Sequence, residues 1–280
     1  MELNTLLQYK PYSTARPEKR ALYAGLLTEL TQFHRERCPE YGRLLDALGC
    51  PAHMDCTVEN TPMLPVSLFK ELELRSIPEG EVFKTITSSG TTGQRVSRIF
   101  LDGATSACQQ QALCQIMSDF LGDRRLPFLV LDSRQVLRNR AMFSARGAGI
   151  LGFSIFGTRP CYALDEHMEL DLDGVRAFLE EHQGETIFLF GFTFIIWKHV
   201  VRALEERGER LDIPNGILVH GGGWKKLAGE AVSPGEFKAR VAAATGVERV
   251  SNYYGMAEQT GCIYMECPQG HLHASLWSDI

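Results

Sequence analysis

Residues 186–208 read TIFLFGFTFIIWKHVVRALEERG, an apolar run followed at once by apolar residues at helical spacing. The run predicts a buried strand near residues 186–190, and the segment after it predicts a helix over 194–207. Thr193 is the expected N-cap of this helix and Gly208 its expected C-cap. A strand that leads directly into a helix is typical of a largely parallel sheet covered by helices.

The same alternation of apolar runs and helical segments extends over the chain after Glu81. Asp102 is the expected N-cap of a helix over 104–121, and Ser233-Pro234-Gly235-Glu236 forms a capping box for a helix that ends near Thr245. The sequence therefore predicts an α/β fold of mostly parallel sheets covered by helices. Further strands are expected near residues 82–87, 96–101, 127–132, 216–220 and 248–253.

The first part of the chain has a different pattern. Leucines at helical spacing predict a helical region over 17–48 that Pro39 interrupts, and further prolines predict an irregular connector over 50–78 with one short helix near 66–72. We therefore expect two parts, an N-terminal helical region with its connector over 1–80 and a nucleotide-binding α/β core over 81–280.

Composition excludes several classes of function. The 280 residues include 29 Lys and Arg against 34 Asp and Glu, which leaves no basic excess for a nucleic acid. The longest apolar stretches fall short of the roughly 20 residues that cross a bilayer, so no membrane span is expected. The first residues lack a secretory signal, which predicts a cytoplasmic protein with its eight cysteines reduced.

Thr87-Ser88-Ser89-Gly90-Thr91-Thr92-Gly93 lies between two expected strands. Glycines let a backbone approach a ligand, and successive N–H groups and hydroxyls can surround phosphate oxygens. The alternative interpretation is a tight hairpin turn, because the same residues are common in turns. A Walker loop is excluded, since no Gly-Lys-Ser/Thr follows and a strand rather than a helix comes next.

Two further segments follow later strands. Gly221-Gly222-Gly223 comes directly after the expected strand 216–220, where ligands of open α/β sheets bind, so it suggests a flat surface for a planar base. Tyr254-Gly255-Met256-Ala257-Glu258 offers one carboxylate that can hold Mg²⁺ beside phosphates and waters. Taken singly, the triplet also fits a flexible turn and Glu258 fits a surface carboxylate.

Taken together, five ordered segments resemble the LuxE-type acyl-protein synthetases, within the adenylate-forming superfamily that includes acyl-CoA and phenylacetate–CoA ligases. The segments are SSGTTGQRVSRI, FGFTFIIW, HGGGWKKL, NYYGMAEQTG and MECPQGHLH, and the resemblance covers roughly residues 60–280. It implies the large N-terminal domain of an adenylate-forming enzyme.

The resemblance also implies roles for individual residues. Glu258 would be the catalytic residue that holds Mg²⁺, and ATP would be the cofactor. The ATP phosphates would lie within Ser88, Ser89, Gly90, Thr91, Thr92 and Gly93, and the adenine against Gly221, Gly222, Gly223, Tyr254 and Gly255. The acyl pocket would involve Phe192, Phe194 and Trp197, although aromatic residues at helical spacing more often belong to a core.

The chain departs from the family pattern at two places. Gln94-Arg95-Val96-Ser97 stands where Pro-Lys-Gly is usual, so Arg95 or Arg98 is the candidate to replace the lysine that contacts phosphate. Ala257 stands where threonine is usual, which removes one hydroxyl from the site of the α-phosphate.

The implied reaction is ATP-dependent activation of a carboxylic acid, here a fatty acid, to an acyl-adenylate. The acyl group would then pass to a thiol, either a protein cysteine or coenzyme A, with an acyl-reductase-type protein as a further partner. An aryl- or fatty-acid CoA ligase is the first alternative. A non-catalytic nucleotide-binding or docking subunit is the second, favoured by the departures at Gln94 and Ala257.

Two expectations concern the end of the chain. Cys262, Cys267, His271 and His273 have the composition of a Zn²⁺ site, but their spacing matches no closed zinc pattern, and alternation at His271 and His273 fits a strand. The resemblance places a ribose-binding aspartate and a small closing domain after these residues. We therefore expect the 280-residue chain alone to bind nucleotide weakly and to turn over poorly.

Overall fold

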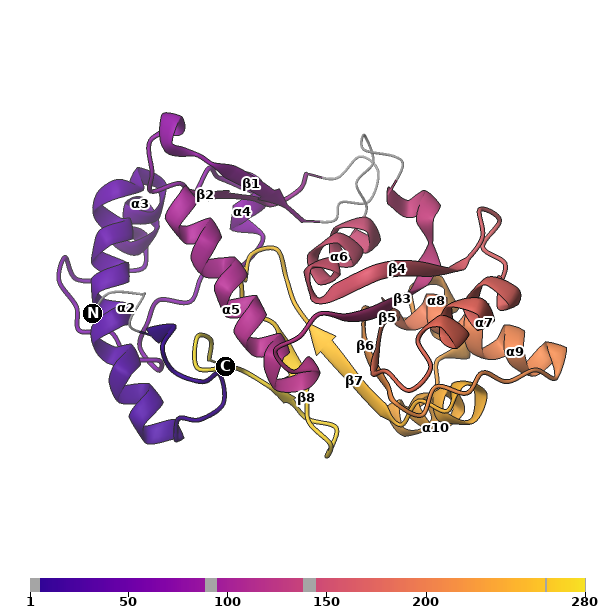
Figure 1. Cartoon of the computed structure of the whole chain (residues 1–280). Helices are drawn as coiled ribbons and strands as arrows, with labels where there is room; N and C mark the ends of the chain where they lie inside the picture. The colour runs from indigo at the N-terminus through magenta and orange to yellow at the C-terminus, as the bar shows by residue number, and fades with distance from the viewer. Residues whose placement is uncertain (1–5, 89–94, 138–144, 260, 280) are drawn as a thin grey trace. The chain divides into compact units, whose positions relative to one another are not determined.

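The computed structural model describes residues 6–88, 95–137, 145–259 and 261–279 (Figure 1). The chain forms two compact units and passes between them more than once. The first unit comprises Met1–Met117, Gly255–Ile263 and Ala274–Ile280, and the second comprises Ser118–Tyr254 and Tyr264–His273. The division of the chain at residue 80 stays a prediction.

The first unit begins with the expected helical region. Pro39 starts a new helix after Cys38, whose extended backbone ends the preceding one, so the predicted interruption is confirmed. The elements of this unit are α2 (Arg16–Arg37), α3 (Pro39–Ala47), α4 (Leu68–Glu71), the 3₁₀ turn Glu79–Glu81, β1 (Lys84–Thr87), β2 (Arg98–Leu101) and most of α5 (Gly103–Leu121).

The strands β1 and β2 form a separate two-stranded antiparallel sheet, in which Lys84 pairs with Leu101 and Thr87 with Arg98. The sequence predicted both strands but not their pairing or direction. Parallel neighbours need a crossover of a dozen or more residues, and the segment between these two strands is too short to supply one.

The second unit is built on one seven-stranded sheet with strand order β4-β3-β5-β6-β7-β8-β9. The strands from β4 to β7 are parallel, and β8 and β9 add to the sheet in antiparallel fashion, which confirms the mostly parallel α/β fold. Their bounds are β3 (Leu126–Ser133), β4 (Gly157–Leu164), β5 (Ile187–Phe192), β6 (Gly216–Gly221), β7 (Arg249–Tyr254), β8 (Tyr264–Glu266) and β9 (Leu272–His273).

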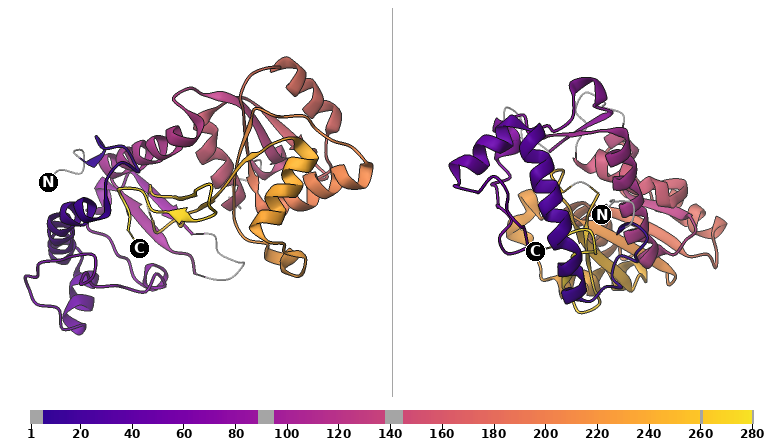
Figure 2. Two further views of the ribbon diagram at one scale, coloured as in Figure 1. Left: turned by 90° about the horizontal axis from the view of Figure 1, so that it is seen from below. Right: turned by 90° about the vertical axis from the view of Figure 1, so that its left-hand side faces the viewer.

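Helices cover both faces of this sheet (Figures 1 and 2). From β3 the chain crosses to β4, its neighbour on one side, and from β4 it crosses back over β3 to β5 on the other side. Because both crossovers are right-handed and run in opposite directions, α6 lies on one face of the sheet and the later helices lie on the opposite face. These helices are α6 (Ala145–Phe153), α7 (Leu172–Glu181), α8 (Thr193–Ile195), a π-helical segment (Ile196–Val201), α9 (Arg202–Arg207) and α10 (Pro234–Thr245). Short 3₁₀ turns lie at Arg134–Leu137, Ser154–Phe156 and Lys225–Glu230.

Helix boundaries follow the expected caps with one exception. Asp102 Oδ1 accepts a hydrogen bond from the backbone N–H of Thr105 at 2.6 Å, and Ser233 Oγ accepts one from Glu236 at 3.2 Å. Gly208 ends α9 with φ of 63°. Thr193 is not an N-cap, because it is the first residue of α8 and its hydroxyl is engaged elsewhere.

Candidate nucleotide-binding site

The strand order of the second unit marks a place for a ligand. The strand β3 lies between β4 and β5, so the chain reverses its direction of winding there. Ligands of open α/β sheets bind outside the carboxyl ends of the strands at such a switch point. Phe192 ends β5 at the switch, and Gly221 and Tyr254 end the next two strands. Three of the predicted site residues of the second unit thus lie at the carboxyl ends of neighbouring parallel strands.

The glycine triplet lies over aromatic rings. A Cβ added to Gly221 would come within 2.5 Å of the Tyr253 ring, and one added to Gly222 would come within 3.0 Å of the Phe192 ring. Gly222 has φ of 77°, which L side chains rarely adopt. A Cβ at Gly223 would meet nothing within 4 Å. The triplet therefore forms a surface of bare backbone. The Tyr253 and Phe192 rings pack against Gly221 and Gly222, and the space beside Gly223 is free.

A buried hydrogen-bonded pair fixes the start of the triplet. Thr193 Oγ1 lies 2.9 Å from His220 Nδ1 and donates to the carbonyl oxygen of Gly221 at 3.1 Å. Because the bond to Gly221 uses the only hydroxyl proton of Thr193, His220 Nδ1 carries a proton and donates it to Thr193 Oγ1. Burial, and secondarily the charge of Lys238, lowers the pKa of His220 to about 3, so the imidazole is neutral at neutral pH. Neither sequence spacing nor composition pointed to this pair.

The three aromatic residues predicted near the acyl pocket have different surroundings. Phe192 is buried, and its ring packs between Gly149 of α6 and Gly222. Phe194 is half-buried. Trp197 is buried in a cluster with Trp224, Phe237 and the Arg240 guanidinium, which lies 4.1 Å from the Trp197 ring centroid. Its packing thus fits the core alternative, and the pocket assignment stays a prediction.

The motif that contains Glu258 begins in the second unit and ends in the first. Tyr254 is 46% exposed and stacks on Tyr264, with ring centroids 6.0 Å apart. Gly255 and Glu258 belong to the first unit, where Glu258 is half-buried in a turn closed by a hydrogen bond from Gln259 N to Met256 O.

The residues around Glu258 limit the kind of Mg²⁺ site that this carboxylate could form. Within the described ranges, no three or more His, Cys, Asp and Glu side chains are arranged to hold a metal ion. This applies equally to the zinc alternative at Cys262, Cys267, His271 and His273. A single half-buried carboxylate suits Mg²⁺ that takes most of its ligands from phosphates and water, as is usual in nucleotide sites. It does not suit a dedicated protein cage.

The predicted phosphate loop is described only at its two ends. Ser88 N donates to Ser97 O at 3.2 Å, and Ser97 N donates to Ser88 Oγ at 2.9 Å, so the two serines close the base of the loop. Ser89, Gly90, Thr91, Thr92 and Gly93 lie outside the described residues. Arg95 pairs with Glu71 at 2.7 Å, and Arg98 lies 4.0 Å from Glu73.

A buried ion pair at the switch point was not predicted. Asp132, near the carboxyl end of β3, is fully buried, and both its oxygens accept from the guanidinium of Arg146 on α6. Gly149, one turn further along α6, packs against Phe192. The sequence signal was an aspartate at the end of the apolar run LPFLVLDS, but its partner could not be read from spacing.

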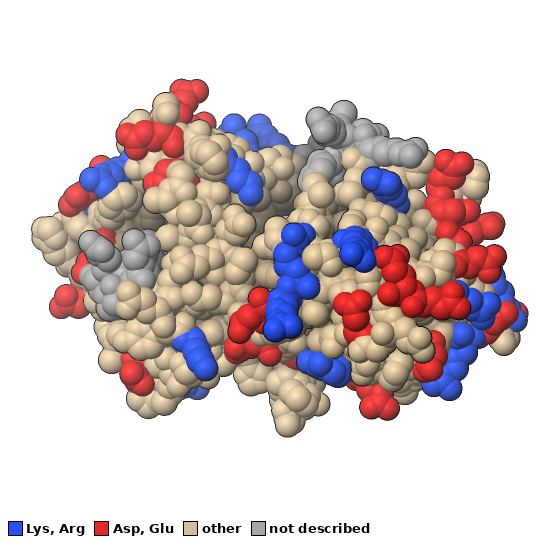
Figure 3. All heavy atoms as spheres, in the orientation of Figure 1, with Lys and Arg blue, Asp and Glu red and all other residues tan. Residues whose placement is uncertain are grey.

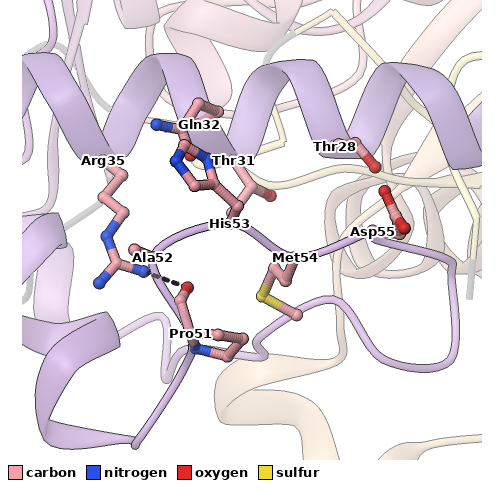
Figure 4. A pocket seen from close by; sticks show the side chains of 9 residues that line it. All are labelled: Thr28, Thr31, Gln32, Arg35, Pro51, Ala52, His53, Met54 and Asp55. Atoms are coloured by element: carbon pink, nitrogen blue, oxygen red, sulfur yellow. Dashed lines mark hydrogen bonds between the residues drawn. The ribbon is translucent and has the colours of Figure 1, made fainter.

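Two hollows of the first unit lie away from the predicted site residues, one beside α2 and one lined by residues 37–40 and 73–79. Figure 4 shows the hollow between α2 and the loop 51–55, where the Arg35 guanidinium donates to Pro51 O at 2.7 Å and also pairs with Asp46. None of its lining residues belongs to the five motifs, and we assign it no role. The face drawn in Figure 3 carries side chains of both charges, and several acidic ones lie together at the upper right of the view. Throughout the described residues, no helix combines the length and apolar character needed to cross a bilayer.

Comparison with solved structures defines the class of fold. Crystal structures of 2-hydroxyisobutyryl-CoA ligase with 2-HIB-AMP and CoA resemble the chain, one in an open conformation and one in the thioesterification state. The TM-scores are 0.58 and 0.63, at 17% and 18% sequence identity over 92% and 98% of this chain. The chain spans 57% of the length of each of them. The fold is therefore that of the adenylate-forming ligases.

Comparison of the sequence gives the family. A family profile described as "Acyl-protein synthetase, LuxE" matches residues 2–280. The chain belongs to the LuxE acyl-protein synthetase family, which confirms the resemblance seen in the five motifs. No protein with a curated description matches the sequence.

Proposed function

We propose that the chain activates a carboxylic acid with ATP and then delivers the acyl group to a protein thiol. A carboxylate oxygen attacks the α-phosphorus, pyrophosphate leaves, and an acyl-adenylate forms. The thiol then attacks the acyl carbon and AMP leaves. The observation that carries this proposal is the glycine triplet at the carboxyl end of β6, backed by Tyr253 and Phe192, in a chain of the LuxE family.

The residues take the following roles in this proposal. The peptide planes of Gly221–Gly223 receive the adenine, and Tyr254 packs near the base. Ser88–Gly93 donate N–H groups and hydroxyls to the phosphates. Glu258 holds Mg²⁺, which when bound neutralises phosphate charge. No side chain forms a covalent bond in the first step, so catalysis rests on positioning and charge stabilisation.

The acid is placed near Phe192 and Phe194, and we propose a fatty acid as the substrate. Phe192 is apolar and buried, and the nearby charges of Asp132 and Arg146 compensate one another. The neutral His220 adds no positive charge beneath the triplet. These surroundings favour an uncharged chain over an acid with a second charge.

The acceptor is proposed to be a protein cysteine, with an acyl-reductase-type protein as the partner. Coenzyme A is the alternative, because the similar 2-hydroxyisobutyryl-CoA ligase structures contain CoA. Supplying each thiol to preformed acyl-adenylate separates the two: rapid release of acyl-CoA contradicts the protein acceptor.

Calorimetric titration with a non-hydrolysable fatty acyl-sulfamoyl adenosine tests the adenylation step. This compound imitates the intermediate, so it should bind far more tightly than ATP or the fatty acid alone. An aryl counterpart of the same compound distinguishes the aryl ligase. A chain that binds adenosine and the acyl compound equally well has no site for the acyl group, and this result favours the docking subunit.

A further inference from the structure

A short segment of the first unit has every carbonyl group bonded by a side chain. We call residues 275–278 the clamped segment. Lys19 Nζ donates to the carbonyl oxygen of Ser275 at 3.0 Å and also to that of Ser278. Tyr23 Oη donates to Leu276 O at 2.7 Å, and the Cys262 thiol donates to Trp277 O at 3.4 Å. Four consecutive carbonyls are thus fixed by three side chains.

Two of these donors come from one face of α2. Lys19 and Tyr23 lie four residues apart, and the Lys19 ammonium is 5.6 Å from the centroid of the Tyr23 ring. Lys19 also lies 3.7 Å from a carboxylate oxygen of Asp279, so its three N–H groups have three acceptors within reach. Ser275 and Leu276 are buried, and removing a partner from buried carbonyls carries a desolvation penalty.

The third donor belongs to the loop that carries Glu258. We call residues 255–263 the Glu258 loop. Gln259 N donates to Met256 O and closes a turn that contains Glu258, and Cys262 N donates to Gln259 O at 3.2 Å. Gly261, with φ of 80°, lies so close to α5 that an added Cβ would be 2.8 Å from Gln109 Cα. The loop is therefore held against α5 at Gly261 and against the clamped segment at Cys262.

The Cys262 thiol acts here as a donor rather than a nucleophile. Burial raises its pKa, the hydroxyls of Ser275 and Ser278 oppose that shift only partly, and the thiol form is the one that donates to Trp277 O. A thiolate would lose this bond. The contact is thus suited to hold the loop in place.

We propose that Lys19 is a positioning residue for Glu258. The ammonium fixes the clamped segment, and the clamped segment fixes the Glu258 loop through Cys262. The role of Glu258 in this statement rests on the proposed function, whereas the hold of Lys19 on the loop does not.

The test compares Lys19→Met with Lys19→Arg, and with Lys10→Met as a matched control on an exposed lysine. The first readout is the rate at which Cys262 is alkylated in the folded protein, measured by peptide mass spectrometry. The second is the Mg²⁺ concentration for half-maximal acid-dependent exchange of pyrophosphate into ATP. We expect both to rise roughly tenfold in Lys19→Met, as for other residues that orient a metal ligand, and to change less in Lys19→Arg. Lys10→Met should match the wild type.

Combination with Glu258→Gln separates positioning from a general loss of structure. If Lys19 acts through Glu258, Lys19→Met causes no further loss of exchange in a Glu258→Gln background. Independent, additive losses overturn the proposal, as does faster Cys262 alkylation with an unchanged Mg²⁺ requirement. Tyr23→Phe removes the hydrogen bond to Leu276, so it should shift both readouts in the same direction if Lys19→Met fails to fold.

Failure of the proposed function looks different. A wild-type chain that shows no exchange with any acid contradicts adenylation, and the alkylation rate of Cys262 then decides alone whether Lys19 holds the loop. An unchanged rate in Lys19→Met overturns the inference.

Discussion

The hydroxyl of Thr193 joins His220 Nδ1, at 2.9 Å, to the carbonyl oxygen of Gly221, at 3.1 Å. The pair connects the first turn after β5 with the end of β6, where the glycine triplet begins. The Phe237 ring of α10 lies over the imidazole, with ring centroids 4.6 Å apart. The imidazole is thus enclosed, and its charge state bears directly on the stability of the candidate site.

The pair predicts acid sensitivity. The pKa of His220 falls from 6.5 in the unfolded chain to about 3 in the fold, so the unfolded chain binds more protons between these pH values. Stability from this group is complete above pH 6.5 and is lost as pH falls towards 3. Between pH 7 and pH 5 the loss amounts to about 2 kcal/mol. Urea unfolding at both pH values should show this loss in the wild type.

His220→Gln is the control, because it keeps a donor for Thr193 and removes the titration. The variant should lose less stability than the wild type between pH 7 and pH 5. His34 and His199, whose pKa values burial also lowers, affect both proteins alike. Equal losses would mean that His220 does not titrate in this range.

Two alanine substitutions in the triplet should have different effects on the free energy of unfolding. Gly221→Ala forces a Cβ against the Tyr253 ring, whose centroid is 5.0 Å from that of the Phe153 ring. The free energy of unfolding should therefore fall by about 1–3 kcal/mol. Gly223→Ala meets no atom and should change it by less than about 0.5 kcal/mol.

Nucleotide titration of the same two variants tests the proposed adenine surface. Gly223→Ala should weaken adenine nucleotide binding without loss of stability, because its methyl group would occupy the place proposed for the base. Full affinity in this variant would remove Gly223 from the site.

Removing one partner of the Asp132–Arg146 ion pair should lower the free energy of unfolding. Asp132→Asn leaves the Arg146 guanidinium without its counter-charge, and we expect a loss of about 3 kcal/mol in the free energy of unfolding. Asp132→Asn with Arg146→Met should cost less than the sum of the two single changes. Denaturant unfolding of the four proteins measures the coupling. A change below about 0.5 kcal/mol in Asp132→Asn would show that the pair is unimportant.

The carboxylate of Glu258 should matter more for turnover than for binding. Glu258→Gln keeps the shape and removes the charge, so acid-dependent exchange should fall at least about tenfold, while ATP affinity falls less. Glu248→Gln, on an exposed carboxylate, is the matched control. Unchanged exchange in Glu258→Gln would exclude Glu258 from the site.

Most of the fold could be predicted because its signals are local. The buried strands β3, β5 and β6 are apolar runs, and caps such as Ser233 mark helix ends within a few residues. The strand β4 was missed because it is an edge strand, where Pro160 and the positive φ of Arg159 interrupt the pattern. The pairing of β1 with β2 was not predicted, because strand direction depends on the length of the connection.

The candidate site was predictable only as separate motifs. The glycine triplet and Glu258 carry a composition that indicates chemistry on its own. The contacts that hold them in place join residues far apart in the chain, such as Thr193 with His220 and Lys19 with Ser275. Sequence spacing does not predict such pairs. The expected convergence of the phosphate loop, the triplet and Glu258 stays a prediction.

Exchange of labelled pyrophosphate into ATP tests the central claim most directly, because it requires reversible formation of the acyl-adenylate and needs no thiol acceptor. The account predicts exchange that depends on a fatty acid, is absent with ATP alone, and falls at least about tenfold in Glu258→Gln. A wild-type chain that binds ATP and yet supports no exchange with any fatty or aryl acid would contradict it.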